Sequence, residues 1–167
     1  MKKLFSMFIM LGIMMFSTTC FASNNSTILI DSLKNDPDYI YIGGVGSGFA
    51  ILLDKTSINV HEYNPPHYTI AFIRIDYSNI PVREPIEAIK SSVHIYHYDY
   101  DTRKIYAEGT DKKQYYVDPI DLSKTNGGRS RLAEAELVFY LAYNMSFFDE
   151  PISPKAREYI NKFLGVC

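Results

Sequence analysis

The stretch Ser92–Tyr100, with the sequence SVHIYHYDY, decides the fold because its side chains alternate in character. In an extended strand, successive side chains point to opposite faces. One face would carry Val93 and Ile95. The other face would carry the aromatic residues His94, Tyr96, Tyr98 and Tyr100. Aromatic and β-branched residues favour strands, so this period of two predicts a β-strand with two unlike faces.

The same pattern extends outward from this strand on both sides. Asp54–Ser57, the loop Asn64-Pro65-Pro66 and Asp101-Thr102 carry turn residues. Between such turns, we expect strands at Tyr39–Ile42, Phe49–Leu53, Ile58–Glu62, His67–Tyr77, Arg103–Ala107 and Gln114–Val117. Short strands joined by tight turns predict an antiparallel meander.

The period changes after Asn126-Gly127-Gly128. Ser130 can cap a new helix, and Glu134 and Glu136 lie near its positive end. Its apolar stripe is Leu137, Leu141, Met145 and Phe148, broadened by Val138 and Ala142. Ser153-Pro154 opens a second helix, which Gly165 ends. The sequence therefore predicts an α+β fold, in which an antiparallel β-meander sheet is followed by two C-terminal helices packed on one face. The first helix is apolar around most of its circumference, so we expect it to lie in the core.

The N-terminal residues predict export. Met1-Lys2-Lys3 is basic, and Leu4–Phe16 is apolar but shorter than the roughly 20 residues that a membrane-spanning helix needs. We expect residues 1–22 to be a signal peptide cut between Ala22 and Ser23, leaving 23–167 as a single α+β domain without a membrane span. Lipidation at Cys20, which would give a lipid anchor, is the alternative.

Charge and cysteine content exclude several classes of protein. The chain has 17 basic and 19 acidic residues, and the predicted signal peptide removes two lysines, so no basic surface for nucleic acid is expected. The two cysteines are Cys20 and Cys167, so a chain cut after Ala22 has no internal disulfide and its fold depends on the hydrophobic core.

No motif predicts a catalytic residue, a metal site or a cofactor. The glycines of Gly43–Gly48 match neither of the phosphate-binding motifs G-x-G-x-x-G and G-x-x-x-x-G-K. A strand rather than a helix is also expected after them. His94 and His97 would point to opposite faces of their strand and could not share one ion. We therefore expect a protein that is not an enzyme.

The aromatic face offers the only candidate binding surface. If it borders solvent, His94, Tyr96, Tyr98 and Tyr100 form a ladder for a protein or glycan ligand. The alternative is that both faces of the sheet are covered, with the tyrosine rings packed at the sheet margin and their hydroxyls in water.

The block Gly48–Ile58, with the sequence GFAILLDKTSI, followed by the long strand His67–Tyr77, resembles the surface-adhesin protein E-like family of small exported bacterial proteins. The resemblance covers roughly residues 39–107. It implies a small, sheet-rich, envelope-located domain, which in some members binds host proteins.

We therefore expect an exported, non-catalytic binding or cell-envelope-associated protein, periplasmic, secreted or bound to the envelope and adhesin-like in role. A hydrolase-like enzyme acting on an envelope substrate is one alternative. A structural subunit of an envelope assembly, joined through Cys167 or an exposed strand edge, is the other.

Overall fold

The computed structural model describes residues 31–44, 49–78, 89–121 and 128–164. The chain divides into two compact units, Met1–Leu33 and Lys34–Cys167, and the account below concerns the second. The predicted cleavage site at Ala22 and Ser23, the lipidation site at Cys20 and the terminal Cys167 lie outside the described residues. These predictions, and a domain beginning at Ser23, therefore stay predictions.

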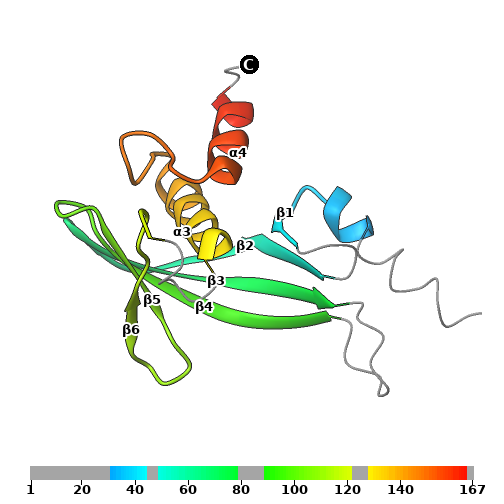
Figure 1. Cartoon of the computed structure of the whole chain (residues 1–167), viewed down its shortest axis with the longest axis horizontal. Coiled ribbons are helices and arrows are strands. Elements are labelled where there is room, and N and C mark those ends of the chain that lie inside the picture. The colour runs from blue at the N-terminus through cyan, green and yellow to red at the C-terminus, as the bar shows by residue number, and fades with distance from the viewer. Residues whose placement is uncertain (1–30, 45–48, 79–88, 122–127, 165–167) are drawn as a thin grey trace, which may run out of the picture. The chain divides into compact units, whose positions relative to one another are not determined.

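The described part of the chain forms an antiparallel sheet of six strands in sequence order (Figure 1). The strands are β1 (Tyr39–Gly43), β2 (Phe49–Asn64), β3 (His67–Ser78), β4 (Ile89–Asp99), β5 (Lys104–Glu108) and β6 (Gln114–Tyr116). Each strand pairs with the one that follows it, so the predicted meander is confirmed.

The second strand differs from the prediction, which placed a turn from Asp54 to Ser57. The structure has one 16-residue strand whose register with β3 shifts between Asp54 and Asn59. The Asp54 carboxylate accepts hydrogen bonds from the Thr56 amide at 2.9 Å and the Thr56 hydroxyl at 2.6 Å. The Ser57 hydroxyl donates to the Asp54 carbonyl and accepts from the Ile73 amide, both at 2.7 Å. Side chains thus satisfy backbone groups that the irregular register leaves unpaired, and the strand continues.

Two helices lie on the same side of the sheet, α3 (Gly128–Tyr143) and α4 (Pro154–Leu164) (Figure 1). Helix α3 packs on β1, β2 and β3, and α4 packs against α3. Every residue from Leu132 to Tyr140 is buried, which confirms that α3 lies in the core. The α+β fold predicted from the sequence is thereby confirmed.

The helix ends differ in part from the predictions. Ser130 lies inside the first turn of α3 rather than capping it, because the helix already begins at Gly128. At the other end, Asn144 adopts φ 53°, which ends α3 before Met145 and Phe148, two residues of the predicted stripe. Ser153 caps α4 as predicted, since its hydroxyl accepts a hydrogen bond from the Ala156 amide at 3.4 Å.

None of the helices within the described ranges is both long and apolar enough to cross a membrane.

The register shift in β2 generates a stability prediction. Replacing Ser57 with alanine leaves the Ile73 amide without its partner, so we expect the free energy of unfolding to fall by about 1–3 kcal/mol. Urea denaturation would measure this change. Thr56→Ala is the matched control, because Thr56 is exposed and its amide keeps its bond to Asp54. An equal loss in both variants would contradict this role for Ser57.

Candidate functional site

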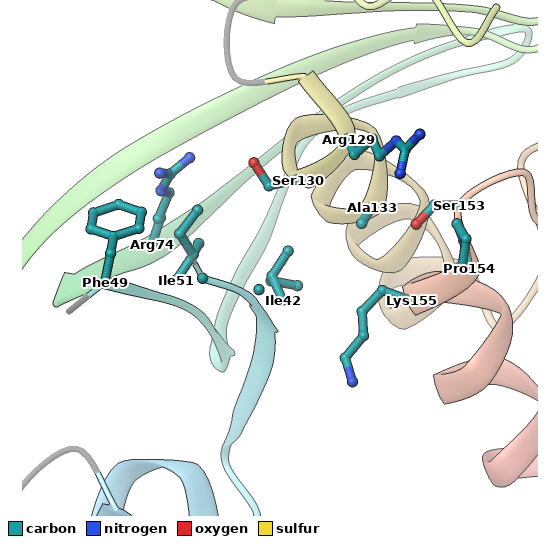
Figure 2. Close-up of a pocket in the computed structure, with 12 residues that line it drawn as sticks. Ile42, Phe49, Ile51, Arg74, Arg129, Ser130, Ala133, Ser153, Pro154 and Lys155 are labelled. Carbon is teal, nitrogen blue, oxygen red and sulfur yellow. The ribbon is translucent and has the colours of Figure 1, made fainter. Parts of the chain in front are cut away.

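A hollow of about 620 Å³ lies where β1 and β2 meet the starts of α3 and α4, and we call it the cationic pocket (Figure 2). Its size is within the range of sites that hold small molecules. The residues lining it are Ile42, Gly43, Gly44, Phe49, Ile51, Arg74, Arg129, Ser130, Ala133, Ser153, Pro154 and Lys155.

One part of the pocket lining is apolar. Ile42 and Ile51 come from neighbouring strands, and Ala133 comes from the facing side of α3 (Figure 2). All three side chains belong to the buried core, while Phe49 is half-buried beside them. These side chains continue the core outward into the hollow, so the pocket offers apolar contact to a ligand.

The charged residues of the lining are all basic, because none of the twelve described residues that line the pocket is acidic. Arg74 is already neutralised, because its guanidinium lies 2.6 Å from Asp76 and 2.9 Å from Glu134. Arg129 is exposed, and Lys155 pairs at 3.1 Å with Glu158, whose side chain is 71% exposed. Exposed ion pairs are weak, so Arg129 and Lys155 are the cations that a ligand could engage.

Both helices begin with cations, which opposes the usual electrostatics of helix ends. The positive end of a helix favours carboxylates, each worth about 0.3–1 kcal/mol. Yet the first turns of α3 and α4 contain no acidic residue, and Arg129 and Lys155 stand there instead. This arrangement concentrates positive potential at the pocket and favours an anion in it. Departures from local rules of this kind are expected at functional sites.

Two buried carboxylates of α3 hold the walls of the pocket in place. Glu134 accepts hydrogen bonds from Arg74 at 2.9 Å and from the Tyr96 hydroxyl at 3.0 Å, and so ties the helix to the sheet. Glu136 accepts bonds from the Ile152 and Ser153 amides at 2.6 and 2.8 Å, and so ties it to the start of α4. Burial raises the pKa of both carboxyls, that of Glu136 to about 7.

His94, Tyr96 and Tyr98 of the predicted ladder lie on one face of β4, and Tyr100 follows the end of the strand. Helix α3 contacts this face at Tyr96 and Tyr98. Tyr96 and Tyr98 are 0% and 2% exposed. The Tyr98 hydroxyl donates to the Ala135 carbonyl at 2.8 Å, and the Tyr100 ring stacks on Phe139 with centroids 6.0 Å apart. A solvent-facing ladder is therefore wrong for Tyr96 and Tyr98, because an apolar helix needs an apolar sheet face to bury itself against. The alternative prediction placed the tyrosine rings at the sheet margin with their hydroxyls in water. The Tyr96 and Tyr98 hydroxyls instead donate hydrogen bonds to α3.

The fourth member of the ladder, His94, lines a second hollow of about 730 Å³, which we call the polar groove. Its Nε2 lies 3.1 Å from the Ser92 hydroxyl. Burial, with Arg74 and Arg131 nearby, lowers the pKa of His94 to about 4. A base that activates serine needs a pKa near the working pH and a carboxylate that orients it. Asp76 acts in the direction such a base needs, but burial and the two arginines outweigh it, so the lowered pKa of His94 does not fit this role.

The other histidine of β4 lies on the opposite face of the sheet, as predicted. His97 Nδ1 is 3.1 Å from the Thr69 hydroxyl, which donates to Glu62 at 3.0 Å. Its Nε2 is 3.5 Å from Glu108. Among the described residues, no three histidine, cysteine, aspartate or glutamate side chains are placed to hold a metal ion.

Sequence reasoning missed the cationic pocket, since Arg74, Arg129 and Lys155 are far apart in the chain. One local signal was present. Arg129 and Arg131 flank Ser130 at a predicted helix start, where acidic residues are the usual choice.

No family model, curated protein or solved structure matches the chain. The resemblance to the surface-adhesin protein E-like family therefore stays a prediction.

Burial of Glu136 predicts a particular pH dependence of stability. Glu136 has a pKa of about 7 in the folded chain against a reference of 4.5, so between these values the folded state binds the proton and the unfolded state does not. Its contribution to stability is therefore full below about pH 4.5 and is lost as the pH rises to about 7.

Glu136→Gln removes this titration, and urea denaturation of both proteins from pH 4 to 8 isolates it from other groups. We expect the unfolding free energy of the native protein, minus that of the variant, to decrease as the pH rises across that window. A difference that stays constant with pH would contradict a raised pKa for Glu136.

Proposed function

We propose that this chain is an exported, non-catalytic binding protein of the bacterial cell envelope, and that the cationic pocket is its ligand site. The observation that carries the proposal is the composition of this pocket, with an apolar lining, two cations that a ligand could engage, Arg129 and Lys155, and no acidic residue among the described residues that line it. A ligand that matches this lining has an apolar body and an anionic group.

Export rests on the N-terminal pattern of basic residues, apolar run and small residues up to Ala22. Intact mass and fractionation of the native protein test it. A chain of residues 23–167 in the soluble envelope fraction, or one acylated at Cys20 in the membrane fraction, would support export. An uncleaved chain in the cytoplasm would contradict it.

Binding to the pocket is tested with the fluorescent probe 8-anilinonaphthalene-1-sulfonate, which joins aromatic rings to a sulfonate. We expect saturable binding at one site of the folded protein, because the rings can lie on Ile42, Phe49 and Ile51 beside the cations. Titration followed by fluorescence measures the affinity, and near-UV circular dichroism verifies that the protein stays folded, since this probe also binds loosened states.

The double variant Arg129→Gln/Lys155→Gln should bind the probe at least tenfold more weakly, because it loses two charges at the pocket. The matched control Lys104→Gln/Lys162→Gln removes the same net charge from exposed positions outside the lining and should bind normally. Equal weakening in both double variants, or no binding by the native protein, would refute the pocket as the site.

A second candidate function, that of a structural subunit, is favoured by the edge of β4. Ile89–Ile95 pairs with β3, whereas β5 pairs only with Tyr96–Asp99, so no other described strand covers this edge. Uncovered edges can pair with another chain. Light scattering across a concentration series tests this candidate: a concentration-dependent dimer or polymer would support it, and a monomer at all concentrations would refute it.

A further inference from the structure

We propose that the natural ligand of the cationic pocket is a lipid with a single acyl chain that ends in an anionic group. This inference rests on the proposed function and names the ligand class for the same site. The chemistry is shared by free fatty acids and by lipids with one chain and a phosphate, and the experiment below distinguishes these two sources.

The volume of the pocket suits one acyl chain, because the part of a ligand that lies inside it must fit about 620 Å³. At about 30 Å³ per non-hydrogen atom, taking liquid water as the yardstick, 620 Å³ holds roughly 20 such atoms. An acyl chain of medium length with its head group fits this volume, whereas a lipid with two long chains exceeds it.

The charges of the pocket select the head group. Arg74 has two carboxylates within 2.9 Å and needs no third partner. Arg129 and Lys155 line the pocket from the first turns of α3 and α4, and both turns lack acidic residues, so the charge of this lining favours an anionic head group over a neutral or cationic one.

The apolar lining selects the tail. Ile42, Phe49 and Ile51 come from β1 and β2, and Ala133 faces them from α3, so a chain lying among them has carbon on both sides (Figure 2). None of these four side chains can donate or accept a hydrogen bond, so this part of the pocket favours a methylene chain over a sugar or a polar peptide.

The experiment measures displacement of the fluorescent probe from the native protein by straight-chain carboxylates of 8, 10, 12 and 14 carbons, kept below their micelle concentrations. Each methylene that enters the apolar lining should tighten binding about fourfold. A lipid with one 12-carbon chain and a glycerol phosphate head is the second arm. Tighter binding of the carboxylate assigns the ligand to free fatty acids, and tighter binding of the phosphate assigns it to the phospholipid type.

Dodecanol and dodecyltrimethylammonium have tails of 12 carbons without an anion, and we expect both to bind at least tenfold more weakly than the 12-carbon carboxylate. Arg129→Gln/Lys155→Gln should abolish that preference for the anion but keep the increase per methylene, and Phe49→Ala should flatten the increase. The control Lys104→Gln/Lys162→Gln should leave both unchanged.

The possible failures are distinct. If the probe binds but no lipid displaces it, or if affinity is independent of chain length, the acyl-chain inference is wrong and the proposed function stands. Equal affinity for dodecanol and the carboxylate would overturn the anionic head group. If neither the probe nor the lipids bind, both proposals are wrong.

Discussion

The fold depends on the burial of Leu132–Tyr140, the middle of α3, between the sheet and α4, which leaves two carboxylates of this helix without water. Glu134 and Glu136 are 0% and 2% exposed, and a buried carboxylate is costly unless hydrogen-bonded partners surround it. Glu134 finds its partners in the sheet, at Arg74 and Tyr96, and Glu136 finds its partners in the backbone before α4. These two residues thus fix one helix against both of its neighbours.

The same constraint creates the pocket. Because Glu136 fixes the residues that precede α4, the start of that helix is held close to α3, and the first turns of both helices line one hollow. The oxygens of Glu136 accept hydrogen bonds from the amides of Ile152 and Ser153, next to that start. The cations Arg129 and Lys155 therefore line the same hollow, each from a first turn that contains no acidic residue.

The sequence predicts the elements well because their periods are local properties. The alternation in Ser92–Tyr100 and the cap at Ser153 depend on neighbours a few residues away, and the structure contains both the strand and the second helix. The long β2 was missed because Asp54 and Ser57, which are typical turn residues, hydrogen-bond within a bulge and across to Ile73. Whether such residues turn the chain or bridge two strands depends on the partner strand, which lies 16 residues away.

The site could not be predicted in the same way, because the sequence does not say which face of a sheet a helix will cover. A strand with His94, Tyr96 and Tyr98 on one face can present them to a ligand or to a helix, and the alternation is the same in both cases. The length of apolar helix that must be buried decides which of the two occurs. In α3, nine consecutive residues, Leu132–Tyr140, are buried, and the tyrosine face of the sheet packs against them. Aromatic residues with hydroxyls suit this role, since Tyr96 and Tyr98 fill the core and also satisfy polar groups of α3. The binding site that we propose lies instead at the margin of that contact, where the starts of α3 and α4 meet β1 and β2 around a hollow lined by cations.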